Sequence, residues 1–540
     1  MKVCLLYISK ERSDDKPYFD TASIIKDLGL KHLFVSAAKR LIYENGAVKS
    51  VEKEDTYLME TLRNVMMVPL HSEEEIIYRQ EILKDFIKNE DMVRELYSIC
   101  TDVIRRWNEL GRGGREKLKQ SNQAMRLTAD IRILHLFSDS LGKIKNILKD
   151  PSLKIESGGL AGFRDDFMNA FPDEKEELLR DVLGDISFYT DGSDDEDEGR
   201  EKIVRPRIVM ESGLEDGLKF SSLKLEEVSS RGEKFYKPGS AKYKLRELVN
   251  SRTPDSFSAV NDARIGEQSQ MLEYGIVSFL VEEMKRMMEE FQSFFDRLRF
   301  QTAFYLAAVQ LKAQMERISG EWCFPEVCDR RDLEFIQLRE LVMALERHVD
   351  VVGNSCSIMN KDLLIVTGAN QGGKSTFLRS IGIAQVMMQS GLMVMAGKYR
   401  AGIFPRLFVH FTRREDSEMN SGRLDEELGR MNRIVEQIGD GSMILLNESF
   451  ATTTEREGSV IAYDIIRALG EAGVRILTVT HLLSFAKRVY EESVKDGGLS
   501  VEFLSAERKD DGRRTFRMIR HAPELTSFGL DLYEEIVGGI

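Results

Sequence analysis

The sequence has few cysteines and lacks long apolar runs. Its 540 residues include five cysteines without a repeated spacing, as is typical of a protein that keeps its thiols reduced. The closest pair, Cys323 and Cys328, has no second Cys/His pair to complete a zinc site. No apolar run approaches the about 20 residues that a membrane-spanning helix needs. Within residues 1–16 a short apolar patch is followed by charged residues, which is unlike a signal peptide. We therefore expect a cytoplasmic protein with no membrane partner and no structural metal.

Basic residues are in the minority. The chain carries 77 Lys and Arg against 90 Asp and Glu, for a formal net charge of −13. This balance argues against a surface that is basic throughout, although a local basic groove is compatible with it. Residues 231–246 interleave basic and aromatic side chains. They are the best local candidate for DNA contact, while a solvated surface is the commoner explanation of such a stretch.

The strongest local pattern lies at residues 363–380. An apolar run rich in branched side chains predicts a strand buried on both faces. The spacing Gly368-x4-Gly373-Lys374-Ser375 then matches a phosphate-binding P-loop at the start of a helix. Its glycines let backbone N–H groups face a phosphate chain. A chance match in a Gly-rich turn is the alternative, but a place between strand and helix is what the mechanism requires. The expected nucleotide-binding residues are Gly368, Ala369, Asn370, Gln371, Gly372, Gly373, Lys374, Ser375 and Thr376.

Two of these P-loop residues have side chains with a direct chemical role. Lys374 places a positive charge on the β- and γ-phosphates, and the Ser375 hydroxyl is a ligand for Mg²⁺. The start of the helix adds the positive end of its dipole to the same anion.

Two further apolar runs end in polar residues. Residues 442–448 end in Asn447-Glu448, and a later run ends in Thr480-His481. In an α/β sheet the carboxyl ends of the strands bind ligands. We expect Glu448 to act as general base toward water, and Asn447 to hold a metal-bound water where many P-loop proteins have Asp. His481 is placed to donate to a γ-phosphate, and a capped core histidine is the alternative.

The rest of the chain is predominantly helical in pattern up to residue 325. Helical periodicity runs through residues 17–150, with a capping box at residues 72–75. Residues 150–260 are mixed and include the acidic, glycine-containing loop 191–201, which should be solvated. A proline-free helical pattern covers residues 264–315, a length that suits a lever or strut. Beyond residue 325, strands and helices alternate.

Residues 363–488 resemble the ATPase domain of the MutS family of DNA mismatch repair proteins. Thr-Gly-Ala-Asn-Gln-Gly-Gly-Lys-Ser-Thr at 367–376 is similar to that family's Thr-Gly-Pro-Asn-Met-Gly-Gly-Lys-Ser-Thr. Phe411-Thr412-Arg413 matches its Phe-Thr-Arg, and Thr480-His481 matches its strand-ending Thr-His. Near the end, residues 526–530 resemble its Ser-Tyr-Gly-Leu segment.

The resemblance implies a multidomain fold. A mainly α-helical core and lever region with a small mixed, clamp-like insertion would be followed by an α/β P-loop ATPase domain of the ABC type. It also implies ATP and Mg²⁺ as cofactors, DNA as a partner, and a homodimer. Ser421 stands where the family has a trans-acting Ser, so Ser421-Gly422 of each subunit would complete the partner's ATP site. The expected parts are an N-terminal extension (1–18), a helical core domain (19–150), the clamp-like insertion (151–263), long lever helices (264–330) and the ATPase domain (331–540).

The sequence also departs from the family. We expect no N-terminal mismatch-recognition domain, since the only Phe-x-Glu is Phe324-Pro-Glu326, and no C-terminal Smr nuclease-like domain. Asn447 replaces the usual Asp, and Gly422-Arg423 replaces Thr-Phe. We therefore expect an ATP-gated dimeric clamp that acts on branched or otherwise structured DNA in repair or recombination. Its catalytic residues would be Lys374, Glu448 and His481, with slow hydrolysis.

Two other functions compete with this one. An ATP-dependent dimerisation switch or scaffold with little hydrolysis is the main alternative, and the changes at Asn447 and Gly422 favour it. A small-molecule kinase is less favoured, because the sequence has no evident lid and such an enzyme has no use for so long a helix.

Overall fold

The computed structural model describes most of the chain: residues 3–8, 16–39, 41–44, 47–51, 54–118, 123–177, 207–215, 219–229, 263–412, 423–494, 500–509 and 513–523. Several features singled out in the sequence lie outside the described residues. They are the acidic loop 191–201, the basic stretch 231–246, Arg413, Ser421, Gly422 and the segment 526–530.

The chain divides into two compact units, each assembled from separate stretches of sequence. The first unit comprises Met1–Val3, Glu95–Leu153 and Arg164–Arg299. The second unit comprises Cys4–Arg94, Lys154–Phe163 and Phe300–Ile540. Helices with several mixed sheets agree with the expected multidomain class. The five consecutive domain ranges expected from the sequence stay a prediction.

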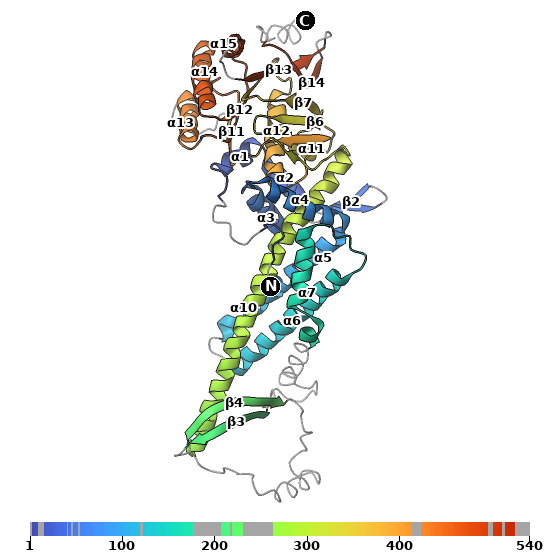
Figure 1. The fold of residues 1–540 in the computed structure, drawn as a ribbon, viewed down its shortest axis with the longest axis vertical. Helices are drawn as coiled ribbons and strands as arrows, with labels where there is room; N and C mark the ends of the chain where they lie inside the picture. The colour runs from blue at the N-terminus through green and yellow to red at the C-terminus, as the bar shows by residue number, and fades with distance from the viewer. Residues whose placement is uncertain are drawn as a thin grey trace, which may run out of the picture. The chain divides into compact units, whose positions relative to one another are not determined.

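Long helices build the first unit (Figure 1). They are α5 (Glu90–Leu118), α6 (Gln123–Lys149), α7 (Gly158–Ala170) and α10 (Ala263–Ile318), of which all but α6 also contribute residues to the second unit. The 56-residue α10 confirms the long helix expected at 264–315. Strands β3 (Arg207–Glu215) and β4 (Lys219–Ser229) pair antiparallel and form a hairpin within the mixed region.

Aromatic side chains pack the interior of the first unit. Phe137 stacks against Trp107 and Phe295, with ring centroids 5.5 Å apart in both pairs. Phe294 meets Phe167 at 6.0 Å. The apolar stripe of α10 therefore serves core packing, as its helical spacing predicts.

Short helices form the N-terminal part of the second unit. They are α1 (Thr21–Asp27), α2 (Leu30–Ala37), α3 (Thr56–Met66) and α4 (Glu73–Lys88). The expected cap at residue 72 is present, because the Glu75 N–H donates to the Ser72 hydroxyl at 3.3 Å. The helical pattern does not continue throughout, since β1 (Leu41–Glu44) and β2 (Ala47–Val51) form an antiparallel hairpin.

Buried Arg79 on α4 ties distant segments of the second unit together. Its side chain donates to the carbonyl oxygen of Leu6 at 3.0 Å and to that of Ser390 at 2.9 Å. The guanidinium also lies over the rings of Tyr7 and Phe304. Residues 3–8 are thus held by a buried cation whose donors are satisfied by backbone carbonyls, as buried polar groups require.

Two sheets form the C-terminal part of the second unit. A four-stranded sheet has the order β5-β9-β6-β7 and a six-stranded sheet the order β10-β11-β12-β8-β13-β14. All neighbours in the larger sheet are parallel except β13 and β14. The elements are β5 (Glu326–Val327), β6 (Leu333–Leu338), α11 (Leu341–Arg347), β7 (Asn354–Ile358), β8 (Leu363–Thr367), α12 (Lys374–Met388), β9 (Lys398–Ala401), β10 (Arg406–Phe411), α13 (Arg423–Val435), β11 (Ser442–Asn447), α14 (Glu455–Glu471), β12 (Arg475–Val479), α15 (Leu483–Ser493), β13 (Val501–Arg508) and β14 (Arg514–Arg520).

The larger sheet owes its core to continuous apolar runs. Every residue of β8 and of β12 is buried, as expected for parallel strands covered on both faces. The alternation of strands and helices expected beyond residue 325 is therefore present.

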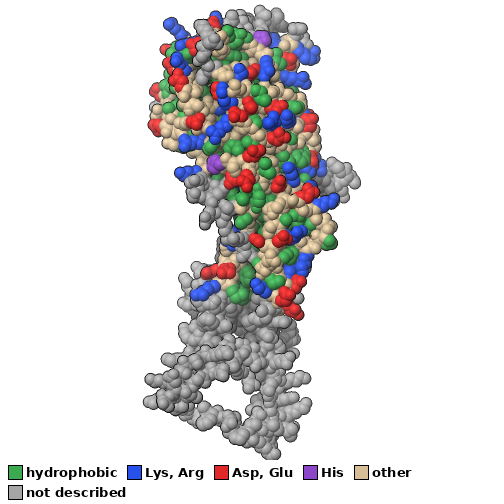
Figure 2. Space-filling view, in the orientation of Figure 1, with side chains coloured by type: hydrophobic (Ala, Val, Ile, Leu, Met, Phe, Trp, Pro, Cys, Tyr) green, Lys and Arg blue, Asp and Glu red, His purple; other side chains and the backbone are tan. Residues whose placement is uncertain are grey.

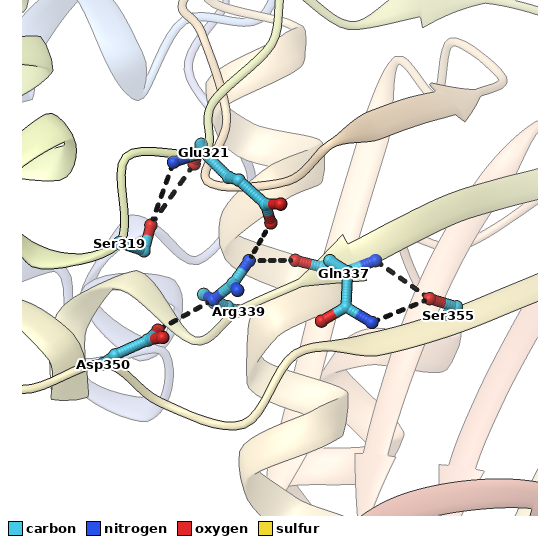
Figure 3. A network of polar contacts seen from close by, with 6 residues as sticks. All are labelled: Ser319, Glu321, Gln337, Arg339, Asp350 and Ser355. Atoms are coloured by element: carbon cyan, nitrogen blue, oxygen red, sulfur yellow. Dashed lines mark hydrogen bonds and ion pairs between the residues drawn. The ribbon is translucent and has the colours of Figure 1, made fainter.

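A polar network centred on Arg339 joins the segment after α10 to the smaller sheet (Figure 3). The guanidinium, 10% exposed, donates to Glu321 at 2.6 Å and to Asp350 at 2.8 Å. It also reaches the carbonyl of Gln337, whose own N–H donates to the Ser355 hydroxyl at 3.0 Å. One cation thereby fixes the chain as it leaves the long helix. Nothing in the sequence pattern indicated this network.

Within the described stretches, no helix is both long and apolar enough to cross a lipid bilayer.

Candidate nucleotide site

The candidate site lies where three neighbouring strands of the six-stranded sheet end. Strand β12 pairs in parallel with β8 on one side and β11 on the other. Their carboxyl ends therefore share one edge, which is where α/β sheets bind ligands. The P-loop follows β8, Glu448 follows β11, and Thr480-His481 follows β12. The sheet register thus brings together the three motifs that the sequence singled out.

The P-loop needs glycine at its two bends. Gly368 has a φ of 108°, and a Cβ there would come within 2.8 Å of the Ala506 backbone nitrogen. Gly373 has a φ of 90° and caps α12 without a side chain. Both values lie in the left-handed region that favours glycine. The N–H groups of the first turn of α12, which contains Ser375 and Thr376, therefore have no side-chain cap and are the groups that bind anions at helix starts.

Lys374 lies across the P-loop. Its ammonium donates to the carbonyl oxygens of Gly368 at 2.8 Å and Ala369 at 3.0 Å. An ammonium has three donors, so one remains for a ligand. Burial lowers the pKa of Lys374, and the negative charge of Glu448 partly opposes that shift. The charge of Glu448 therefore acts on the lysine across the edge of the sheet.

Asn447 and Glu448 occupy the end of β11. The Asn447 Oδ1 atom is buried and finds no hydrogen-bond partner among the described residues. Glu448 has a φ of 54°, and its N–H donates to the Val479 carbonyl at 2.8 Å. Its Oε1 lies 4.0 Å from Nδ1 of His481, and both side chains are more than a third exposed. An orphaned polar oxygen thus lies beside an accessible carboxylate and imidazole.

Two contacts at the site were not anticipated from the sequence. The Thr412 hydroxyl donates to the carbonyl oxygen of Glu448 at 2.6 Å, so the Phe411-Thr412 motif holds the end of β11. Arg514 donates to the side-chain oxygen of Gln371 at 2.8 Å and so braces the P-loop from β14. The motif around Thr412 was visible in the sequence but carried no role, whereas Arg514 gave no signal.

Comparisons with known proteins match both ends of the chain. Residues 364–536 match the model of MutS domain V, and residues 71–192 match that of the MutS2 N-terminal domain. Both matches support a MutS-family protein.

Proteins named Endonuclease MutS2 are among its relatives. That of Lacticaseibacillus casei (strain BL23) is 33% identical over 157 residues, which are 29% of this chain and 20% of the relative. That of Carboxydothermus hydrogenoformans is 24% identical over 389 residues, covering 67% of this chain and 48% of the relative. That of Streptococcus sanguinis (strain SK36) is 26% identical over 221 residues, covering 41% of this chain and 27% of the relative. The chain thus spans less than half the length of these MutS-family relatives.

The residues of this candidate site fit a nucleotide with its magnesium ion. An uncapped helix start and a lysine with a remaining donor suit a phosphate chain. A half-buried Ser375 in the first turn and the unpartnered Asn447 oxygen suit a hydrated divalent cation, which takes oxygen ligands and keeps several waters. Asn447 contributes no negative charge, so this site should bind the cation less strongly than a site with aspartate at this position.

Proposed function

We propose that the second unit binds ATP with Mg²⁺ and hydrolyses it. The observation that carries this proposal is the convergence of Lys374, Glu448 and His481 at the shared carboxyl edge of β8, β11 and β12. Membership of the MutS family and the match to MutS domain V support it.

In this proposal the P-loop holds the phosphates. The uncapped N–H groups at the start of α12 face the phosphate oxygens, and Lys374 turns its remaining proton toward the β- and γ-phosphates. The Ser375 hydroxyl would be a ligand of Mg²⁺, and the buried, unpartnered Asn447 oxygen would accept a hydrogen bond from a water bound to the ion. When bound, the cation neutralises charge that develops on the phosphate oxygens.

Glu448 and His481 have complementary parts in hydrolysis. The Glu448 carboxylate accepts a proton from water as the water oxygen bonds to the γ-phosphorus and the bond from that phosphorus to the bridging oxygen breaks, giving ADP and phosphate. His481 donates a hydrogen bond to a γ-phosphate oxygen. Their exposure leaves both groups accessible to water and substrate.

We further propose that the protein acts on DNA as a dimer. Ser421-Gly422 of each subunit would complete the partner's site, and nucleotide binding would close the dimer on branched or otherwise structured DNA. On the face in Figure 2, acidic and basic side chains are intermingled over the described residues. A DNA contact would therefore draw on a local basic stretch such as residues 231–246, in line with the net charge of −13.

The alternative is an ATP-dependent dimerisation switch that hardly turns over. The uncharged Asn447 favours it, because a neutral amide binds a divalent cation less strongly than a carboxylate. Its distinguishing property is nucleotide binding without hydrolysis.

Single-turnover hydrolysis by Glu448→Gln protein tests the proposal. The amide keeps the size of the side chain but takes up no proton, so the rate should fall at least about 100-fold. Nucleotide affinity, measured separately with a fluorescent analogue, should stay close to the parental value. Glu491→Gln on the exposed face of α15 is the matched control and should keep the parental rate. A Glu448→Gln protein that hydrolyses ATP at the parental rate contradicts the assignment.

A further inference from the structure

The turn that carries Glu448 is conformationally demanding. Glu448 has a φ of 54° and Phe450 a φ of 66°, so two non-glycine residues within three positions lie in the left-handed region. Such conformations persist only where surrounding contacts hold them. The contacts of this turn therefore bear on where the Glu448 carboxylate points.

Glu427 on α13 holds the turn with both of its carboxylate oxygens. The Phe450 N–H donates to Oε1 at 2.6 Å, and the Thr452 hydroxyl donates to Oε2 at 2.7 Å. The Glu427 side chain is only 6% exposed. Hydrogen bonds to a buried carboxylate are charge-assisted and strong, so this residue constrains the turn more than a neutral acceptor would.

Buried His410 supports the same turn from β10. The Ser449 hydroxyl oxygen lies 2.7 Å from Nδ1 of His410 and 3.0 Å from the His410 carbonyl oxygen. The Nε2 atom lies 3.2 Å from the Glu427 carbonyl, which only accepts, so Nε2 carries a proton. The His410 ring stacks on Phe450 at 5.8 Å. The turn is thus held at Ser449, Phe450 and Thr452.

The helix that bears Glu427 is itself anchored one turn further on. Arg430 donates to the Phe411 carbonyl at 2.9 Å and pairs with Asp27 at 3.4 Å, and both charged side chains are less than a tenth exposed. Residues three apart on a helix share a face, so Glu427 and Arg430 together dock α13. If α13 shifted, the turn after β11 would therefore move with it.

We propose that Glu427 is a positioning residue for hydrolysis: through Phe450 and Thr452 it holds the turn that aims Glu448 at the P-loop. This rests on the proposed ATPase function and extends it to a residue whose carboxylate contacts the turn rather than the P-loop. Glu427 acts only through Glu448, so it should govern turnover and leave nucleotide binding unchanged.

Glu427→Gln tests the proposal in the full-length protein. An amide nitrogen cannot accept, so one of the two hydrogen bonds is lost while size is kept. We expect kcat to fall by about 10- to 100-fold through misplacement of Glu448, with KM for ATP and the affinity for a fluorescent nucleotide unchanged. The exposed Asp425→Asn on the same helix is the matched control. Thr452→Val should act like Glu427→Gln, Thr452→Ser should restore the rate, and Thr453→Val should have no effect.

Amide hydrogen exchange separates this proposal from the proposed function. In Glu427→Gln protein, a peptide covering residues 448–452 should exchange faster, while one covering β8 should not change. Unchanged exchange together with parental kcat overturns the positioning role. Equal losses of kcat and nucleotide affinity also overturn it, because they indicate general damage to the fold. If the parental protein shows no turnover at all, both the ATPase function and the positioning role fail, whereas turnover that is insensitive to Glu427→Gln refutes the positioning role alone.

Discussion

Glu448 Oε1 lies 4.0 Å from Nδ1 of His481, although the two residues follow different strands. The parallel pairing of β11 with β12 sets this separation, since Asn447 lies opposite Val479 and the Glu448 N–H donates to the Val479 carbonyl. Neither side chain is buried, so the pair lies at the accessible edge of the sheet rather than in the core. A base and a hydrogen-bond donor beside a P-loop lysine form the arrangement on which the proposed chemistry depends.

Removing the Lys374 ammonium should abolish nucleotide binding. Lys374→Ala deletes the ammonium that contacts the carbonyl oxygens of Gly368 and Ala369, and with it the charge proposed for the β- and γ-phosphates. We expect the dissociation constant for a fluorescent ATP analogue to rise by at least about 100-fold, which is about 2.7 kcal/mol. Lys487→Ala on the exposed face of α15 is the control and should bind normally. Normal binding by Lys374→Ala would refute the site.

Stability should depend on pH through the same lysine. Because burial lowers the pKa of Lys374 from 10.5, the unfolded chain binds more protons than the folded one between the lowered pKa and 10.5. Stability therefore rises with pH in that window. Neutral Lys374→Met lacks this dependence. The Tm of the parental protein minus the Tm of the variant should therefore increase as the buffer moves from about pH 8 to about pH 10. A decrease in this Tm difference over the same pH range would contradict the buried environment of Lys374.

Asn447→Asp should speed hydrolysis. The Asn447 oxygen is buried without a partner among the described residues, and a carboxylate there would contribute a charge to the bound cation. We expect turnover to rise about tenfold, equivalent to about 1.4 kcal/mol in the barrier, and half-saturation to occur at lower Mg²⁺. Asn447→Ala should instead leave the Tm near the parental value, because no hydrogen bond within the described structure is lost. Slower turnover in Asn447→Asp would exclude the proposed contact with the cation's water shell.

Arg339→Ala should destabilise the second unit without touching the site. The substitution removes ion pairs to Glu321 and Asp350 from a guanidinium that is 10% exposed. Both acidic partners are about half exposed, so solvent screening limits the loss to about 1–2 kcal/mol of unfolding free energy. Trp322, which lies beside this network, can report unfolding in a Trp107→Phe background.

The control for this substitution is Arg347→Ala, which alters an exposed arginine at the end of α11. It should change the unfolding free energy by less than about 0.5 kcal/mol. Equal effects of the two substitutions would mean that the Arg339 network contributes nothing specific.

Much of the candidate site was predictable from local sequence. The glycines of the P-loop, the apolar strands and the polar residues at their ends are local signals, and parallel pairing then places them at one edge. The long α10 was equally plain, because an unbroken helical period without proline extends over many turns.

Contacts between distant segments were not predictable. The carboxylate of Glu427 binds a turn that lies beyond the next strand, and Arg339 meets partners on either side of it in sequence. Such contacts depend on tertiary packing, which leaves no periodic trace in the sequence. The hairpin of β1 and β2 was missed because two short strands cannot establish a period of their own within a helical region.

The central claim is that the protein is an ATPase that responds to DNA. Steady-state ATP hydrolysis by the full-length protein, measured alone and with duplex, branched or single-stranded DNA, tests it most directly. We predict turnover that branched DNA stimulates and that is lost in a parallel Lys374→Ala sample. Nucleotide binding without turnover under any of these conditions would contradict the account and favour the dimerisation switch.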